Sequence, residues 1–263
     1  MAPKVPAADA ALQLTTYLAA QRTPVPAIQI ARDLDLPRST TYDLLSVLVE
    51  RGFALHLASE RLYGIGPAAF ELAGGYARQE PLARIGRRVV ENLVDEVGES
   101  GHLAVLHGRD VLYIVEERAR NRPSLVTDVG VRIPSHLTAS GRALLAELPP
   151  AQLRSLYGRE ADFTARTSAP GPTTPQQLRA LLADVRREGV AEETGEVTDT
   201  LSSLAAVVRD HTGWPAAAVA LTFVEDHTSD EDRARLAVAV REAAGELTRR
   251  LHGPVGSGSP SRT

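Results

Sequence analysis

The chain contains no cysteine, and aromatic residues make up only 4% of its 263 positions. Without cysteine there can be no disulfide, thiolate nucleophile or thiolate metal site, which fits a reducing compartment. The histidines are scattered and show no metal-ligand spacing of the HExxH type. The sequence also has no G-x-S-x-G turn and no phosphate-binding P-loop. We therefore expect no catalytic residue, no cofactor and no metal site. An enzyme is the alternative, because small α/β domains can carry catalytic sites.

Long apolar runs are also missing. The longest, around residues 214–224, is far shorter than the ~20 residues that a membrane-spanning helix needs. The N-terminal segment MAPKVPAADA has no apolar core of the signal-peptide type. At this length the chain has room for about two domains. We expect a soluble cytoplasmic protein that has no membrane partner.

Excess positive charge is the third feature that the chain lacks. The net charge is −4, and residues 1–80 contain seven Lys or Arg against eight Asp or Glu. This balance argues against nonspecific coating of nucleic acid, which depends on neutralising phosphates. Any DNA affinity must come from the local placement of arginines and from dimerisation.

The stretch LPRSTTYDLLSVLVERG, residues 36–52, is typical of an amphipathic helix. Apolar positions recur at i, i+3, i+4 and i+7, and they are Thr41, Leu44, Leu45 and Leu48. Pro37 suits the first helical turn, where its missing N–H loses no hydrogen bond, and Gly52 ends the helix. Taken alone, such a helix is usually an ordinary surface helix.

The neighbours of this helix favour a more specific interpretation. A short helix over residues 25–36 leads into it with almost no room for a loop, which predicts a helix-turn-helix. Two short strands are expected at 53–57 and 61–65, and their hairpin would form a wing. A helix over residues 8–21 can pack behind the motif. Residues 8–66 are therefore predicted to form a winged helix-turn-helix DNA-binding domain.

The predicted DNA contacts divide into two groups. Two arginines would contact phosphate or the minor groove, namely Arg38 and Arg61. The side chains expected in the major groove are those of Ser39, Thr40, Tyr42 and Asp43. The partner is then double-stranded operator DNA.

The remaining chain alternates between helices and short strands. Residues 67–80 are expected to form a linker helix that contains several small residues. This helix is either a simple connector or a dimer contact. Within residues 81–252, helices are expected at 82–97, 150–157 and 175–188. Residues 136–146 are expected to form a loop that is capped into a helix, and Ser229 caps a final helix running to about Leu251. Strands are expected at 102–107, 111–115, 124–129, 203–208 and 215–224. This pattern predicts a mixed α/β domain with mostly antiparallel pairing, followed by a disordered tail at 253–263.

Together these segments resemble the IclR family of bacterial transcriptional regulators. The resemblance runs from about Ala10 to Leu251 and is carried by LPRSTTYDLLSVLVERGF, RLYGIGPAAFEL, IPSHLTASGRALLAELP, REGVAEETGEVTDTLSSLAAVV and HTGWPAAAVALTF. It implies an α+β protein in which a winged helix-turn-helix is joined by a linker helix to a GAF-like effector-binding domain. It also implies a homodimer or dimer of dimers on palindromic operators. A constitutive dimeric regulator without an effector is the alternative.

Two positions depart from the family pattern. Asp43 stands where the family usually has arginine, and a carboxylate there is unfavourable near phosphates but can accept a hydrogen bond from cytosine. Ser203 stands where many members have cysteine. The presence of Asp43 therefore implies either an unusual operator sequence or pairing of Asp43 with a nearby arginine. The departure at Ser203 bears on the identity of the effector more than on the site itself.

The segment Thr138–Gly141 opens one of the expected helices. Free N–H groups and the helix dipole favour a carboxylate there, and Ser140 adds a hydroxyl donor. Alternatively, Thr138 is only an N-cap. The resemblance implies that the effector pocket is also lined by Ala139, Glu193, Leu201, Ser203, Ala220 and Thr222.

We therefore expect a small-molecule effector, and a carboxylic acid is the candidate class. The alternative for the hydroxyl residues of the expected pocket is that they only fill the core. Glu193 would repel an anionic effector unless it is protonated or paired. His102 and His107 flank an expected strand, and we assign them to the surface or to hydrogen-bonded core positions.

Overall fold

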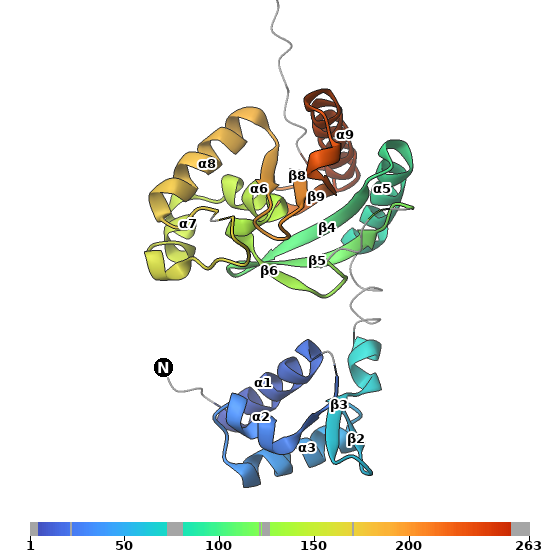
Figure 1. Ribbon diagram of the computed structural model, residues 1–263, viewed down its shortest axis with the longest axis vertical. Coiled ribbons are helices and arrows are strands. Elements are labelled where there is room, and N and C mark those ends of the chain that lie inside the picture. Colours follow the sequence, from blue (N-terminus) through green and yellow to red (C-terminus); the bar gives the residue numbers. More distant parts are fainter. Residues whose placement is uncertain are drawn as a thin grey trace, which may run out of the picture. The chain divides into compact units, whose positions relative to one another are not determined.

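The computed structural model describes residues 5–21, 23–72, 81–120, 122, 127–169 and 171–253. The chain divides into two compact units, residues 1–80 and residues 81–263, each with its own hydrophobic core. Figure 1 shows both units, and each is described by itself below.

The N-terminal unit is a helix-turn-helix with a three-stranded sheet. Its elements are α1 (Pro6–Ala20), β1 (Val25–Pro26), α2 (Ala27–Asp33), α3 (Arg38–Glu50), β2 (Ala54–Leu57) and β3 (Leu62–Ile65). The sheet order is β1-β3-β2, and β2 and β3 form the expected hairpin. The helix expected from residue 25 begins two residues later, because Val25 and Pro26 pair with β3 instead.

The turn between α2 and α3 is as tight as the sequence indicates. Asp35 adopts a left-handed conformation with φ of 51°, which Asp tolerates better than most residues. On α3, Thr41, Leu45 and Leu48 are buried, whereas Tyr42 lies on the opposite face and is exposed. The amphipathic α3 predicted from the apolar spacing is therefore confirmed.

The C-terminal unit is built on one six-stranded antiparallel sheet of order β6-β5-β4-β9-β8-β7. Its strands are β4 (Ser100–His107), β5 (Asp110–Glu117), β6 (Arg132–Pro134), β7 (Ala191–Thr194), β8 (Leu201–Arg209) and β9 (Pro215–Val224). Its α-helices are α5 (Pro81–Val97), α6 (Ala139–Glu147), α7 (Pro150–Leu156), α8 (Pro175–Glu188) and α9 (Asp230–Arg250). Short 3-10 turns lie at η1 (Ser135–Leu137), η2 (Glu160–Asp162) and η3 (Glu225–His227).

Helices cover both faces of this sheet (Figure 1). Helices α5 and α9 lie on one face, and α6, with α7 and α8 beyond it, lies on the other. Successive strand residues point to opposite faces, so β9 sends Val219 and Leu221 toward α5 and α9 but Ala218 and Ala220 toward α6. The small side chains on the α6 face let this helix approach the sheet closely.

The predicted elements and the structure differ at several places. Residues 123–126, within the strand predicted at 124–129, lie outside the described residues, and residues 127–130 are not in a strand. The short strands β6 and β7 were not predicted. Residues 67–72 of the predicted linker helix are helical, whereas residues 73–80 and most of the predicted tail, 254–263, lie outside the described residues.

Candidate functional site

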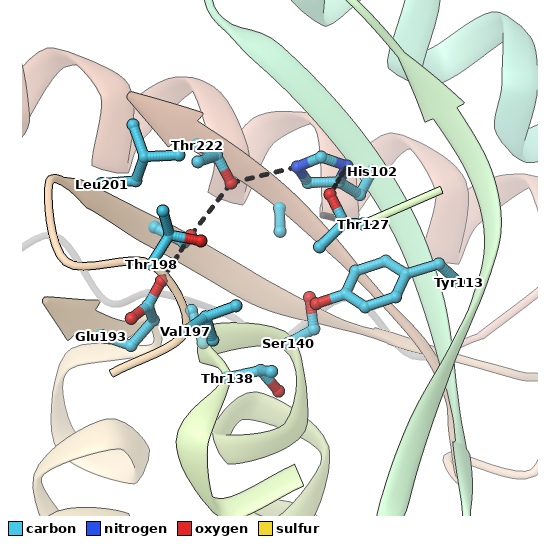
Figure 2. Close-up of a pocket in the computed structure, with 13 residues that line it drawn as sticks. His102, Tyr113, Thr127, Thr138, Ser140, Glu193, Val197, Thr198, Leu201 and Thr222 are labelled. Atoms are coloured by element: carbon cyan, nitrogen blue, oxygen red, sulfur yellow. Dashed lines mark hydrogen bonds between the residues drawn. The ribbon is translucent and has the colours of Figure 1, made fainter. Parts of the chain in front are cut away.

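A cavity lies between the N-terminal end of α6 and the sheet of the C-terminal unit (Figure 2). Its lining comprises His102, Tyr113, Thr127, Thr138, Ala139, Ser140, Glu193, Val197, Thr198, Leu201, Ser203, Ala220 and Thr222. The seven residues named from the sequence as candidate effector contacts all belong to this lining. These seven residues, which are up to 83 positions apart in the sequence (Ala139 to Thr222), thus surround one space.

Strand register explains why three polar residues of this lining are adjacent. Glu193 on β7 pairs with Ser203 on β8, and Ser203 pairs in turn with Thr222 on β9. Directly opposed residues of antiparallel strands place their side chains on the same face. The resulting contacts run from Ser203 Oγ to Glu193 Oε1 at 2.8 Å and to Thr222 Oγ1 at 2.9 Å.

His102 on β4 continues this polar row. Its Nε2 lies 3.0 Å from Thr222 Oγ1, and its Nδ1 lies 3.5 Å from Thr127 Oγ1 (Figure 2). The imidazole meets the ring of Tyr113 edge-on, with centroids 5.6 Å apart. Here His102 is buried and hydrogen-bonded, so it is a core residue as expected, but it also lines the cavity.

The opposite wall is the first turn of α6. Thr138 is its N-cap and accepts a hydrogen bond from the N–H of Gly141 at 2.9 Å. A first helical turn has N–H groups that no helical carbonyl can reach, and at this end they belong to Ala139 and Ser140. A side chain at Gly141 would place its Cβ 2.1 Å from the carbonyl oxygen of Ser135, so only glycine lets η1 lie against α6.

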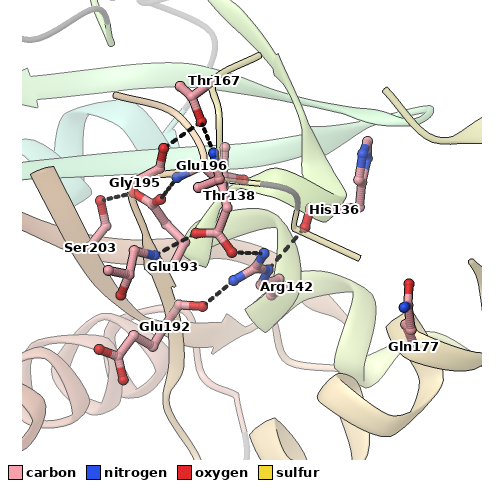
Figure 3. Close-up of polar contacts among 12 residues, drawn as sticks. His136, Thr138, Arg142, Thr167, Gln177, Glu192, Glu193, Gly195, Glu196 and Ser203 are labelled. Carbon is pink, nitrogen blue, oxygen red and sulfur yellow. Dashed lines mark hydrogen bonds and ion pairs between the residues drawn. The ribbon is translucent and has the colours of Figure 1, made fainter. Parts of the chain in front are cut away.

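A buried arginine fixes the edge of the cavity that follows β7 (Figure 3). Arg142 on α6 donates from Nε to the carbonyl of His136 at 2.9 Å and from one terminal nitrogen to the carbonyl of Glu192 at 2.5 Å. Its other terminal nitrogen lies 2.7 Å from Glu196 Oε1. The backbone N–H of Glu196 in turn donates to Glu193 Oε2 at 3.2 Å. The side chain of Arg142 therefore links α6, β7 and the segment after it.

Burial controls the charges within the cavity. It raises the pKa of Glu193 to about 8, and neighbouring Glu196 adds to the rise. It lowers the pKa of His102 to about 4, with a smaller contribution from Arg118. The pKa of Tyr113 is also raised, first by burial and then by Glu193. At neutral pH these physical effects favour an uncharged lining.

The cavity is narrow. Its volume is about 20 Å³, and a space of roughly 10–15 Å³ is needed to hold one water molecule. A carboxylic acid would therefore need lining residues to move apart. Val197 and Thr198 come from the segment between β7 and β8, where residues 195–200 form bends and turns rather than regular structure.

Several lining residues are not among the effector contacts predicted from the sequence, namely His102, Tyr113, Thr127, Val197 and Thr198. The face on which His102 lies can be predicted from the sequence. Side chains alternate along β4, so His102 lies on the same face as Ala104, which packs toward α6. The other four depend on how loops and β5 meet the helix. No pattern within their own segments indicates that arrangement.

The six predicted DNA contacts lie at two places in the N-terminal unit. Arg38, Ser39, Tyr42 and Asp43 are exposed on the first half of α3, and Thr40 there is partly buried. Arg61 is exposed in the turn between β2 and β3, with φ of 56°. The exposed side chains of α3 therefore lie opposite its buried stripe, where a duplex can reach them.

Two further features concern other classes of site. Among the residues that the structure describes, no group of three His, Asp or Glu side chains could hold a metal ion. No helix in the described ranges is long and apolar enough to cross a bilayer.

Comparison with known families assigns both units. Residues 7–56 match the IclR helix-turn-helix domain, and residues 74–249 match the C-terminal domain of bacterial transcriptional regulators of the IclR type. The chain belongs to the IclR family. It is therefore a DNA-binding transcriptional regulator, as the resemblance of its motifs indicates.

Individual relatives agree with the family assignment. The Pca regulon regulatory protein of Pseudomonas putida is 31% identical over 227 residues, which cover 86% of this chain and 77% of that protein. An IclR-type regulator from a Silicibacter species has a crystal structure with a TM-score of 0.82 and 27% identity, covering 95% of this chain and 98% of that chain.

A third relative was crystallised with a ligand. This IclR homologue from Microbacterium hydrocarbonoxydans was solved in complex with 4-hydroxybenzoate. Its TM-score is 0.77 at 24% identity, with 93% of this chain and 98% of that chain covered. At this identity the comparison establishes the shared fold.

Proposed function

We propose that operator binding by this IclR-family regulator is controlled by a small anionic metabolite bound in the cavity of its C-terminal unit. One observation carries the proposal: the six residues named from the family resemblance and Ser140, named from the expected helix N-terminus, all line the same cavity. That the Microbacterium homologue was crystallised with an aromatic carboxylate supports an acid as the ligand class.

The chemistry of the cavity suits a carboxylate. The first turn of α6 presents N–H groups and the positive end of the helix dipole, and both favour an anion. Ser140 and Thr222 add hydroxyl groups that can donate hydrogen bonds. Because charge-assisted hydrogen bonds are the stronger kind, a few such donors can hold a small acid.

The DNA-binding half of the proposal assigns the two winged helix-turn-helix units of a homodimer to the halves of a palindromic operator. Arg38 and Arg61 contact phosphate or the minor groove, while Ser39, Thr40, Tyr42 and Asp43 face the major groove. We assign residues 8–66 to DNA binding, 67–80 to the linker and 81–252 to effector binding. The protein would act in the cytoplasm. The effector then acts by changing how the linkers set the spacing of the DNA-binding units.

The proposal is tested by measuring both binding events. Fluorescence anisotropy with DNA from the intergenic region beside the regulator's own gene should give specific binding that weakens steeply with salt. A thermal-shift screen of benzoate, 4-hydroxybenzoate and short carboxylic acids should identify a stabilising acid. An acid at ~100 times its dissociation constant adds about 2.7 kcal/mol to the free energy of unfolding.

Two results would contradict the proposal. If no acid stabilises the protein or alters the operator complex, a constitutive regulator without an effector is favoured. If footprinting at low salt reveals no protected site, the operator assignment fails. Arg38→Ala serves as the control, because it should weaken DNA binding and leave the thermal shift by an acid unchanged.

A further inference from the structure

The carboxyl group of Glu193 is buried, with 3% of the residue exposed. Its Oε1 accepts a hydrogen bond from Ser203 at 2.8 Å, and its Oε2 accepts one from the backbone N–H of Glu196 at 3.2 Å. Neither partner carries a positive charge that could balance an ionised carboxylate. An unbalanced charge at such a depth is strongly disfavoured.

The nearest cation is committed to another acid. The guanidinium of Arg142 donates to two backbone carbonyls and pairs with Glu196 at 2.7 Å (Figure 3). Two neighbouring carboxyl groups, Glu193 and Glu196, thus face one cation, and the geometry gives that cation to Glu196. When two acids compete in this way, the unpaired one retains the proton.

The other charged or titratable groups around Glu193 come from several elements. They are Glu196 after β7, Arg142 on α6, Tyr113 on β5 and His102 on β4, while Arg166 in the segment before α8 acts on Tyr113. Burial is the main cause that raises the pKa of Glu193 to about 8; the hydrogen bond from Ser203 lowers this pKa, Glu196 raises it, and Arg142 lowers it. The surroundings as a whole therefore favour the neutral acid.

A neutral Glu193 would also set the direction of the hydrogen bonds along the adjacent polar row, which consists of Ser203, Thr222 and His102. Hydroxyl groups can either donate or accept, and an imidazole can carry its proton on either nitrogen. The row from Ser203 through Thr222 to His102 can therefore orient its protons to suit the state of Glu193. No member of the row needs a formal charge for its hydrogen bonds to be satisfied.

We propose that Glu193 determines the specificity of the cavity by holding a proton at neutral pH, which lets an acid bind as its anion beside a neutral carboxyl group. This inference rests on the function proposed above. An ionised Glu193 would repel a carboxylate but would not repel the uncharged amide of the same acid. The affinity for the anion is therefore constant at neutral pH and falls about tenfold per pH unit once Glu193 ionises.

The first measurement needs no ligand. In full-length protein labelled with ¹³C-glutamate, NMR follows the carboxyl carbon of Glu193 between about pH 4 and pH 10. The proposal expects a midpoint well above neutral pH, and this resonance is absent in Glu193→Gln. A midpoint in the ordinary glutamate range overturns the proposal whatever the protein binds.

The second measurement uses benzoate and benzamide, which have no second group that titrates in this range. Calorimetry should show that the affinity for benzoate falls about tenfold per pH unit above the midpoint, while the affinity for benzamide does not. Glu193→Gln should make the benzoate affinity independent of pH. Glu192→Gln is the matched control, because Glu192 is the exposed neighbour on β7 and should keep the wild-type pH profile.

The two measurements separate the possible failures. A raised midpoint with no benzoate binding supports the proton on Glu193 and counts against aromatic acids as effectors in the proposed function. Benzoate binding with the same pH profile in wild type and Glu193→Gln overturns the specificity role of Glu193. Because the NMR titration uses wild-type protein, poor folding of a variant does not affect it.

Discussion

The guanidinium of Arg142 and the carboxylate of Glu196 form an ion pair of 2.7 Å inside the C-terminal unit, where their side chains are 3% and 13% exposed. The pair joins α6 to the segment after β7, which forms one edge of the cavity. Both charges have lost most of their hydration, so each depends on the other for compensation. The same pairing leaves Glu193 without a cation.

Removing the arginine should be costly. Arg142→Met leaves Glu196 as a largely buried, uncompensated charge, which typically destabilises a protein by about 3–5 kcal/mol. Urea denaturation of wild type and variant at neutral pH measures the free energy of unfolding. Arg187→Met is the control, since Arg187 forms ion pairs with Asp184 and Glu188 at the surface, where such pairs contribute little to stability. Similar losses in both variants would show that the buried pair has no special role.

The DNA contacts should separate into two kinds. Arg38→Ala removes a proposed phosphate contact, so binding to all operator variants should weaken alike and the salt slope should fall by about one. Asp43→Ala should instead change the preference among operator variants, because a carboxylate can accept a hydrogen bond from cytosine. Anisotropy titrations against a panel of operators at several salt concentrations measure both effects.

The control for these variants is Arg87→Ala. Arg87 is an exposed arginine on α5 in the other unit, so its replacement should leave DNA binding unchanged. If Arg38→Ala and Asp43→Ala alter every operator equally, the proposed division into phosphate and base contacts is wrong.

Hydroxyl groups in the cavity should matter for the effector response and not for DNA binding. Losing a hydrogen bond to a charged group typically costs ~1.5–3 kcal/mol, or roughly ten- to a hundredfold in affinity. Ser140→Ala combined with Thr222→Val should therefore shift the acid titration of the operator complex by at least this factor. Operator binding without added acid should stay as in wild type.

Ser202→Ala is the control for these variants, because it removes a hydroxyl group that lies outside the cavity. Ser202 lies beside Ser203 on β8, but its hydroxyl contacts Glu225 and it is not part of the cavity lining. This variant should respond to the acid as wild type does. An unchanged response in the double variant Ser140→Ala/Thr222→Val would mean that the acid binds elsewhere.

Much of the fold is predictable where a local pattern decides the element. The apolar spacing of α3 and the two strands of the wing hairpin are set by neighbours in the sequence. β7 was missed because it has only four residues, and two of them are glutamates, which disfavour strands. Its pairing with β8 comes from the tertiary structure, so no local pattern indicates it.

The candidate site was predictable only in part, for the same reason. The family resemblance names Ser203 and Thr222, and strand register then brings them together. It does not name His102, whose place in the cavity depends on α6 covering that face of β4. The ion pair of Arg142 with Glu196 spans 54 positions of the sequence, so only the folded structure shows which of two glutamates the arginine neutralises.

Acidification should destabilise the protein through His102. Burial lowers the pKa of His102 from 6.5 to about 4 in the folded protein, so between these values the unfolded chain binds a proton that the folded protein does not. The free energy of unfolding then falls as pH decreases from about 6.5 toward 4, by up to about 1.4 kcal/mol per pH unit. Glu193 acts in the opposite direction, because its raised pKa means that stability is lost as pH rises from 4.5 toward 8.

Replacing the imidazole isolates this effect. His102→Gln removes the titrating group and keeps an amide that can hydrogen-bond to Thr222, so the variant should lose about 2 kcal/mol less than wild type between pH 7 and pH 5. Urea denaturation at both pH values measures the difference, to which Glu193 contributes equally in the two proteins. His107→Gln, an exposed change at the end of the same strand, should keep the wild-type loss. If His102→Gln shows the same loss as wild type, burial does not lower the pKa of His102 in the folded protein, and the loss of stability in acid must come from other groups.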